Sequence, residues 1–225
     1  MREDEADMAR TALITGATGG LGGAVVERFA ADGWNVVGVD KRPGEDRERV
    51  RFVEADLFDQ AEVDRAVASA GDELQAVVNL VGGFAAPGRV HETPIEDFER
   101  QFTLNLRPTY LVTAAAIPRL QRGTIVCVGT RAALRPFPGA AGYVASKAAL
   151  LALVRALDTE YRDEGIRINA VLPSVIDTPA NRAAMPDADH ASWVGPGEIA
   201  EVIHFLSSDA SSPISGAEIP VYGRA

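Results

Sequence analysis

Short runs of β-branched and aliphatic residues alternate along the chain with longer stretches of helical periodicity, and this alternation restricts the fold more than any other feature. The short runs lie at 11–15, 35–39, 50–55, 76–81, 124–129 and 166–172, and a last one at 217–221. The helical patterns lie at 22–31, 60–70, 95–120, 141–163 and 197–207. Short, uninterrupted apolar runs are typical of parallel strands buried on both faces. We therefore predict an α/β fold: one doubly wound sheet of about seven parallel strands, with helices on both faces.

The two ends of the chain and the segment after the second predicted strand allow further predictions. The last run, "AEIPV", contains Pro220, which a sheet tolerates at an edge strand. The segment 41–49, "KRPGEDRER", is short and highly charged, so we expect a solvated loop there in place of a full helix. The acid-rich residues 1–10 are expected to form a flexible segment, and residues 11–225 a single domain.

Composition excludes several classes of protein. The formal net charge of −10 argues against a nucleic-acid partner, because neutralising phosphates needs a basic face. No apolar run approaches the ~20 residues that span a bilayer, so we expect no membrane partner. Cys127 is the single cysteine, which excludes an internal disulfide and favours a reducing compartment. We expect a cytoplasmic protein.

A glycine-rich turn follows the first predicted strand and precedes a helix. In "TGATGGLG", residues 15–22, the glycines Gly16, Gly20 and Gly22 have the spacing G-x3-G-x-G. Glycines permit a tight turn and a close approach of the backbone to a pyrophosphate, which then faces the helix N-terminus. Because of its position between a strand and a helix, this turn predicts a nucleotide site.

Asp40 ends the second predicted strand and bears on the choice of nucleotide. A carboxylate at this place accepts hydrogen bonds from both ribose hydroxyls of the adenosine and repels a 2′-phosphate, which favours NAD over NADP. Lys41 and Arg42 follow directly, and either could reach a 2′-phosphate, so NADP stays possible. The alternative for Asp40 is a carboxylate that initiates a turn.

Further polar residues lie at the predicted strand ends. Asp56 follows the third strand, where it either bonds an adenine amino group or caps the next helix. Asn79 and Gly82 close the fourth strand, at the carboxyl edge where open α/β sheets bind ligands.

Tyr143 and Lys147 lie four residues apart in an Ala- and Leu-rich helical pattern, "YVASK", and therefore share one helix face. A phenol with a pKa of ~10 is a poor base at neutral pH. An ammonium at ~4 Å contributes ~4 kcal/mol at an effective dielectric of ~20, which would move the phenol toward ~7. Desolvation acts in the opposite direction, so Lys147 and a positively charged nicotinamide would have to outweigh it. The alternative is an interfacial aromatic next to a solvated lysine.

Two polar residues are candidates to complete this site. Thr130 follows the strand "TIVCV", and its hydroxyl could hold a substrate oxygen beside the phenol. Asn105 lies inside a long helical pattern, where Asn is unfavourable, so a buried Asn105 would need a role such as positioning a water near Lys147. The alternative is an exposed Asn105. Pro108 could kink the same helix.

Together these motifs resemble the short-chain dehydrogenase/reductase family over nearly the whole chain, from "TGATGGLG" to "SGAEIPVYG". The resemblance implies a Rossmann-type oxidoreductase that moves a hydride between NAD(P) and a carbonyl or alcohol substrate. It assigns acid/base catalysis to Tyr143, the lowering of its pKa and a ribose contact to Lys147, a proton relay to Asn105 and the usual serine position to Thr130. The cofactor contacts it implies are Gly16, Thr18, Gly20, Leu21, Gly22, Asp40, Lys41, Asp56, Leu57, Asn79, Val81, Gly82, Lys147, Pro173, Ile176 and Thr178.

The chain departs from the family pattern at several positions. Thr130 adds a methyl group to the usual serine, and Leu80 and Val81 replace residues of the usual Asn-Asn-Ala-Gly. The segment after Thr178, together with "VGG" and "GTRAAL", resembles dihydropteridine reductases, which suggests an NADH-dependent reductase of that kind as an alternative. Candidate walls of a shallow substrate pocket are Met185, His190 and Trp193, each of which could equally pack within its loop. No paired His spacing indicates a metal site.

An alternative of another class is a nucleotide-binding regulatory protein with weak catalysis, which Thr130 would permit and an intact Tyr143 and Lys147 argue against. The long helical patterns at 95–120 and 141–163 could each bury a second apolar face. With the family resemblance, they predict a homodimer or homotetramer.

Overall fold

Seven strands form one parallel sheet in the computed structural model, which describes residues 10–225. The strands are β1 (Thr11–Thr15), β2 (Asn35–Asp40), β3 (Val50–Glu54), β4 (Leu74–Asn79), β5 (Leu120–Val128), β6 (Arg167–Pro173) and β7 (Glu218–Val221). Their order is β3-β2-β1-β4-β5-β6-β7, and every neighbouring pair is parallel. This arrangement confirms the predicted doubly wound, Rossmann-type α/β fold. β7 lies at an edge, as expected for a strand that contains Pro220.

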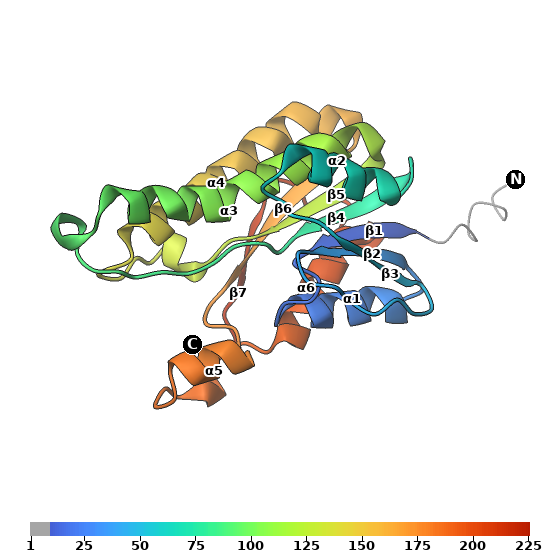
Figure 1. The fold of residues 1–225 in the computed structure, drawn as a ribbon. Coiled ribbons are helices and arrows are strands. Elements are labelled where there is room, and N and C mark those ends of the chain that lie inside the picture. Colours follow the sequence, from blue (N-terminus) through green and yellow to red (C-terminus); the bar gives the residue numbers. More distant parts are fainter. Residues whose placement is uncertain (1–9) are drawn as a thin grey trace, which may run out of the picture.

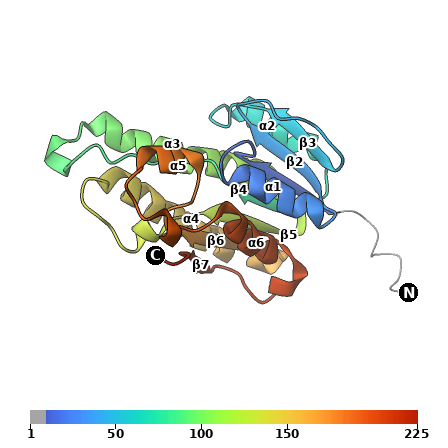
Figure 2. The ribbon, with the colours of Figure 1, turned by 90° about the horizontal axis from the view of Figure 1, so that it is seen from below.

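Helices cover both faces of the sheet (Figure 1). They are α1 (Gly22–Ala31), α2 (Gln60–Ser69), α3 (Ile95–Ala116), α4 (Ala141–Tyr161), α5 (Pro179–Ala184) and α6 (Pro196–Ser207). α2, α3 and α4 pack side by side on one face, and α1 and α6 lie together on the other, as both views show (Figures 1 and 2).

The core consists of two clusters, one on each face of the sheet, and the period of the strands divides their residues between them. In β1, Leu13 belongs to the cluster under α2, α3 and α4, whereas its neighbours Ala12 and Ile14 belong to the cluster under α1 and α6. Successive side chains of a strand point to opposite faces, so a strand covered on both sides is apolar throughout. This is why the short runs without alternation form the buried strands here.

The structure differs from the predicted elements mainly at their ends. β4 and β5 begin earlier than predicted, at Leu74 and Leu120. α3 ends at Ala116 and runs into a short 3-10 turn, and it continues through Pro108. α5 was not predicted, because six residues are too few to display a helical period. The segment 41–49 has no helix, as expected.

Two expectations concern the division of the chain. The flexible segment predicted for residues 1–10 lies, apart from Arg10, outside the described residues. The single domain predicted for 11–225 remains a prediction, to which the one continuous sheet adds support. Because all seven strands are parallel, their carboxyl ends meet at one edge, and this edge holds the candidate site.

Candidate active site

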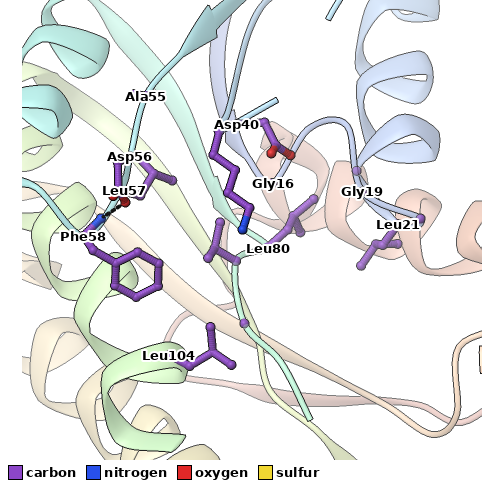
Figure 3. Close-up of a pocket in the computed structure, with 15 residues that line it drawn as sticks. Gly16, Gly19, Leu21, Asp40, Ala55, Asp56, Leu57, Phe58, Leu80 and Leu104 are labelled. Carbon is purple, nitrogen blue, oxygen red and sulfur yellow. Dashed lines mark hydrogen bonds between the residues drawn. The ribbon is translucent and has the colours of Figure 1, made fainter. Parts of the chain in front are cut away.

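A cavity of about 330 Å³ opens at the carboxyl ends of β1, β2, β3 and β4 (Figure 3). Ten of the residues predicted to contact a cofactor line it: Gly16, Gly20, Leu21, Gly22, Asp40, Lys41, Asp56, Leu57, Val81 and Gly82. Five lining residues were not among the predicted cofactor contacts, and these are Gly19, Ala55, Phe58, Leu80 and Leu104. Of these, Gly19 belongs to the glycine-rich turn and Leu80 to the predicted departure from the family pattern, and the other three carried no signal in the sequence.

The turn after β1 needs its glycines for two separate reasons. Gly16 has a φ of +67°, a left-handed conformation that favours glycine. A Cβ at Gly22 would lie 2.1 Å from the carbonyl oxygen of Gly16, which is backbone and cannot move aside. The first turn of α1 therefore packs directly on the strand end, and the N-terminus of this helix faces the cavity.

Asp40 lies at the end of β2 and is only 9% exposed. Its carboxylate accepts hydrogen bonds from the backbone N–H groups of Thr18 (3.1 Å) and Arg42 (3.3 Å). The Arg42 guanidinium lies 3.9 Å from the same carboxylate and also donates to the Thr18 carbonyl oxygen. Asp40 thus both stabilises the turn after β2 and lines the nucleotide cavity, so the two predicted roles do not exclude one another.

Asp56 lines the cavity but does not cap the helix that follows. Its Oδ1 accepts a hydrogen bond from the backbone N–H of Phe58 at 2.9 Å. Asp59 is the N-cap of α2 and accepts from the Glu62 N–H at 3.0 Å. The helix-capping alternative for Asp56 is therefore wrong, because Asp59 lies one position before the helix and takes that role.

Six of the residues predicted to contact the cofactor do not line this cavity: Thr18, Asn79, Lys147, Pro173, Ile176 and Thr178. Thr178 nevertheless borders it, since a Cβ at Gly20 would lie 2.8 Å from the Thr178 methyl group. The Asn79 amide donates to Thr113 Oγ1 at 3.2 Å inside the core beneath α3. Asn79 thus lies behind the cavity wall.

Lys147 is buried behind the wall of the same cavity. Its Nζ donates to the carbonyl oxygen of Val128, at the end of β5, at 2.9 Å. A Cβ at Gly82 would lie 3.1 Å from this Nζ, so the ammonium lies directly behind the cavity lining. The lysine is 6% exposed, which excludes the solvated lysine that the sequence left open.

The pKa values of the pair follow from burial. Burial lowers the pKa of Lys147 to about 8, with the ionisable Cys127 acting weakly in the opposite direction. Desolvation raises the pKa of Tyr143, and a hydrogen bond with Thr130 partly offsets this. The chain's own groups therefore do not lower the phenol pKa, so the lowering predicted from Lys147 would need the further positive charge of a bound nicotinamide.

Asn105 is fully buried in the middle of α3 and joins three parts of the site. Its Oδ1 accepts from the Gly83 N–H at 3.0 Å, and its Nδ2 donates to the Gly83 carbonyl and to Ser146 Oγ, both at 3.1 Å. The exposed alternative is wrong. The side chain connects the segment after β4 with α4 next to Lys147, and the predicted proton relay through it remains a prediction.

One aromatic side chain that the sequence did not predict lies against Tyr143, and a second lies next to the first. The Phe84 ring meets the Tyr143 ring edge to face at 5.0 Å between centroids, and Phe137 lies 6.1 Å from Phe84. Both phenylalanines are exposed. They lie in loops, where no periodicity distinguishes a residue at a site from any other.

The predicted wall residues differ in their surroundings. Trp193 is buried, and the His190 ring lies 4.4 Å from it and bonds the Met185 carbonyl oxygen at 2.8 Å. His190 and Trp193 thus pack on each other, as the loop-packing alternative expects, and Met185 is exposed. Within residues 10–225 no three His, Cys, Asp or Glu side chains gather as a metal would require.

No helix in the described part of the chain is both long enough and apolar enough to span a membrane.

Comparisons with known proteins agree with this geometry. The family model for short chain dehydrogenases matches residues 10–189. The chain is 29% identical to 2-(R)-hydroxypropyl-CoM dehydrogenase of Xanthobacter autotrophicus, over 96% of this chain and 98% of that protein. It is 32% identical to the 3-oxoacyl-(acyl-carrier-protein) reductase MabA of Mycobacterium tuberculosis, over 96% and 92%. The crystal structure of the 3-ketoacyl-(acyl-carrier-protein) reductase of Brucella melitensis complexed with NADH superimposes with a TM-score of 0.84 at 31% identity, covering 96% and 98% of the two chains.

Proposed function

The chain belongs to the short-chain dehydrogenase family, and from this premise we propose which of its residues carry the reaction. It is an oxidoreductase that transfers a hydride between a nicotinamide dinucleotide and a carbonyl or alcohol substrate. We propose that Tyr143 donates the proton to, or accepts it from, the substrate oxygen. The observation that carries this proposal is that Lys147, one helical turn after Tyr143, and Asn105, which bonds Ser146 of the same helix, both lie against Gly82 in the lining of the nucleotide cavity.

The residues around the cavity fit a dinucleotide. Glycine occupies position 22, where a Cβ would collide with backbone, and the N-terminus of α1 faces the space in front of it. When bound, the dinucleotide supplies the carbon that gives or takes the hydride. The chain's part is to hold the pyrophosphate near Gly16, Gly20 and Gly22, and the adenosine near Asp40, Asp56 and Leu57.

The preferred dinucleotide is NAD. Asp40 places a carboxylate at the end of β2 and keeps both oxygens within reach of neighbouring donors, so a 2′-phosphate there would meet a fixed negative charge. The Arg42 guanidinium is engaged with Asp40 and with the Thr18 carbonyl oxygen. Lys41 also lines the cavity, and its ammonium is the cation there that could attract a 2′-phosphate.

Proton transfer is assigned to the chain's own side chains. Tyr143 lies in the first turn of α4, and Thr130 lies beside it at the end of β5. We assign to the Thr130 hydroxyl the task of holding the substrate oxygen against the phenol. Lys147 places an ammonium one helical turn from Tyr143, and together with the positive charge of a bound, oxidised nicotinamide it would favour the ionised phenol.

The test is the variant Tyr143→Phe assayed with NADH and a panel of ketones, with NADH binding followed by its fluorescence. We expect turnover to fall by about 10²–10⁴-fold, with NADH binding unchanged. Tyr161→Phe, at the far end of the same helix, is the matched control and should keep full turnover. Full activity of Tyr143→Phe would remove the proposed role.

Neither alternative reading gains support from the comparisons reported above. Those relatives are dehydrogenases and reductases, which does not favour a regulatory protein without catalysis, and none of the three is a dihydropteridine reductase.

We further propose that the chain assembles as a homodimer or homotetramer through the outer faces of α3 and α4. We also propose a cytoplasmic location, for which the single, buried Cys127 is the support.

A further inference from the structure

A second cavity, of about 270 Å³, adjoins Tyr143 on the side of the first turns of α3 and α4. Its apolar lining comes from Ala85, Pro87 and Val90 in the segment after β4 and from Ile95 and Phe98 in α3. An apolar cavity of about 150 Å³ suffices to bind benzene. This cavity therefore has room for a ring with a substituent, directly beside the proposed acid/base.

One polar side chain in this lining lacks a partner. Gln101 is only 5% exposed, and its Oε1 has no hydrogen-bond partner among the described residues. A buried amide oxygen left unpaired is unfavourable by an amount comparable to a lost hydrogen bond. The Thr93 hydroxyl, also in the lining, already donates to the carbonyl oxygens of Gly88 and Arg89. Gln101 is thus the group that a ligand would satisfy.

Aromatic rings next to Tyr143, which itself lines this cavity, favour a flat ligand. Phe84 contacts the Tyr143 ring edge to face and has an exposed fraction of 61%, and Phe137 stands next to it. Aromatic side chains are typical of ligand sites, because they bury apolar surface and stack on a flat ligand, and the rings of Phe98 and Tyr143 belong to this lining.

The charge of the lining excludes one class of ligand. Asp97 is the ionisable side chain in this lining besides Tyr143, and it carries a negative charge. Glu96 precedes it in the same first turn of α3. A carboxylate, phosphate or acyl thioester with an anionic tail would meet repulsion here without a compensating cation in the lining.

We propose that this cavity binds the far end of the substrate, and that the substrate is a neutral carbonyl compound or alcohol bearing a ring with a hydroxyl or amino donor that bonds Gln101. This inference rests on the proposed function, because it places the reacting oxygen of the same molecule at Tyr143. It narrows the substrate class to ring-containing ketones or alcohols with a hydrogen-bond donor away from the reacting carbon.

The experiment compares two ketones of similar size, 4-hydroxyacetophenone and 4-methylacetophenone, together with the 3-substituted pair. Calorimetric titration into the enzyme with NAD⁺ bound measures affinity without turnover, because an oxidised nicotinamide cannot reduce a ketone. In at least one of the two pairs, we expect the hydroxyacetophenone to bind about tenfold more tightly than the methylacetophenone substituted at the same position. This is the difference expected when one buried hydrogen bond forms to a group that otherwise has no partner.

Variants of Gln101 assign that difference to its side chain. Gln101→Met, of similar length, should abolish the preference for the hydroxyl compound, and Gln101→Glu, which keeps an acceptor, should retain it. The control Gln60→Met changes an exposed glutamine on α2 and should leave the preference intact. Equal affinities for the two compounds in the unchanged enzyme, or a preference that survives in Gln101→Met, would overturn the proposal.

Two further outcomes separate this inference from its alternatives. If the ketones bind with the expected preference but no ketone is reduced with NADH, the proposed function fails while the cavity assignment holds. If no ring compound binds, the inference is wrong, and a smaller species of Ile95→Lys in sedimentation would then assign the cavity to a contact with a second copy of the chain.

Discussion

Lys147 places a charge where the fold offers little solvent. The ammonium is 6% exposed, keeps one protein acceptor, the Val128 carbonyl, and has its pKa lowered to about 8 from an ordinary 10.5. The unfolded chain therefore binds more protons than the folded one between those two pH values, so this group's contribution to stability rises as the pH rises through that range. At neutral pH the buried charge destabilises the fold.

Replacing Lys147 by Met should therefore separate stability from catalysis. We expect Lys147→Met to lose turnover yet to increase the free energy of unfolding at pH 7 by about 1–3 kcal/mol. This gain should shrink as the pH rises from 8 toward 10.5, because the folded wild type then holds a neutral lysine and the free-energy cost of removing its proton falls as the pH approaches 10.5. Urea denaturation at pH 7 and 9.5 measures both effects, and a variant less stable than wild type at pH 7 would contradict the expectation.

Asp40 offers a test of dinucleotide preference at a single carboxylate. Asp40→Asn keeps the size and one acceptor but removes the negative charge, so NADPH should no longer be repelled and NADH should lose part of its ribose contact. We expect the ratio of kcat/KM for NADH over NADPH to fall about tenfold, which corresponds to about 1.4 kcal/mol. Asp64→Asn, on the exposed surface of α2, is the control. An unchanged ratio would show that Asp40 does not set the preference.

Among the elements, the first turn of α1 contains a matched pair of glycines, Gly22 and Gly23. A Cβ at Gly22 would lie 2.1 Å from the Gly16 carbonyl oxygen, whereas a Cβ at Gly23 would meet nothing within 4 Å. We expect Gly22→Ala to disrupt the turn and abolish NADH binding. Gly23→Ala, within α1, should keep binding and stabilise the chain by about 0.5–1 kcal/mol, because alanine favours a helix. Fluorescence titration and thermal melts test both, and equal behaviour of the two variants would contradict the assignment.

The packing of α3 against the segment after β4 depends on Asn105. Its side chain makes three hydrogen bonds, two with Gly83 and one with Ser146. Asn105→Ala would leave the half-buried N–H and carbonyl groups of Gly83 without their partner and open a gap at a fully buried position, so we expect a loss of about 2–4 kcal/mol in the free energy of unfolding and a lower kcat. Thr103→Ala, exposed on the same helix, is the control. A loss of kcat without any change in stability would indicate the water relay rather than this packing.

Most elements were predictable from the sequence because burial on both faces leaves a simple pattern. The uninterrupted apolar strands and the glycine turn ahead of α1 follow from it directly. The early start of β5 at Leu120 was not predictable, because "LQRG" shows neither an apolar run nor an alternation. α5 was missed for lack of length.

The site divides in the same way. Residues tied to a strand end or a helix, such as Asp40, Tyr143 and Lys147, could be placed from sequence because the element positions them. Phe84, which lies against Tyr143, belongs to an irregular segment whose path depends on tertiary packing. Gln101 has the helical position of an ordinary core residue, and only the structure shows that its amide oxygen lacks a partner.

Across the whole molecule, the helices on each face of the sheet carry an exposed large hydrophobic side chain. Tyr110 on α3 is 58% exposed, and Phe205 on α6, on the opposite face, is 43% exposed. α3 and α4 are long, parallel to one another and uncovered on their outer side in the single chain (Figure 1). A subunit contact on this face would bury Tyr110 and leave Phe205 in solvent.

Charged replacements at these two positions therefore test the proposed assembly. Tyr110→Arg should place a cation in an apolar contact and shift sedimentation velocity toward a smaller species, whereas Phe205→Arg should leave the assembly unchanged. Because neither residue lines the nucleotide cavity, NADH binding should persist in both. If Phe205→Arg alone dissociates the assembly, the contact uses α6 on the opposite face. A wild-type chain that sediments as a monomer at micromolar concentration would refute the proposed assembly altogether.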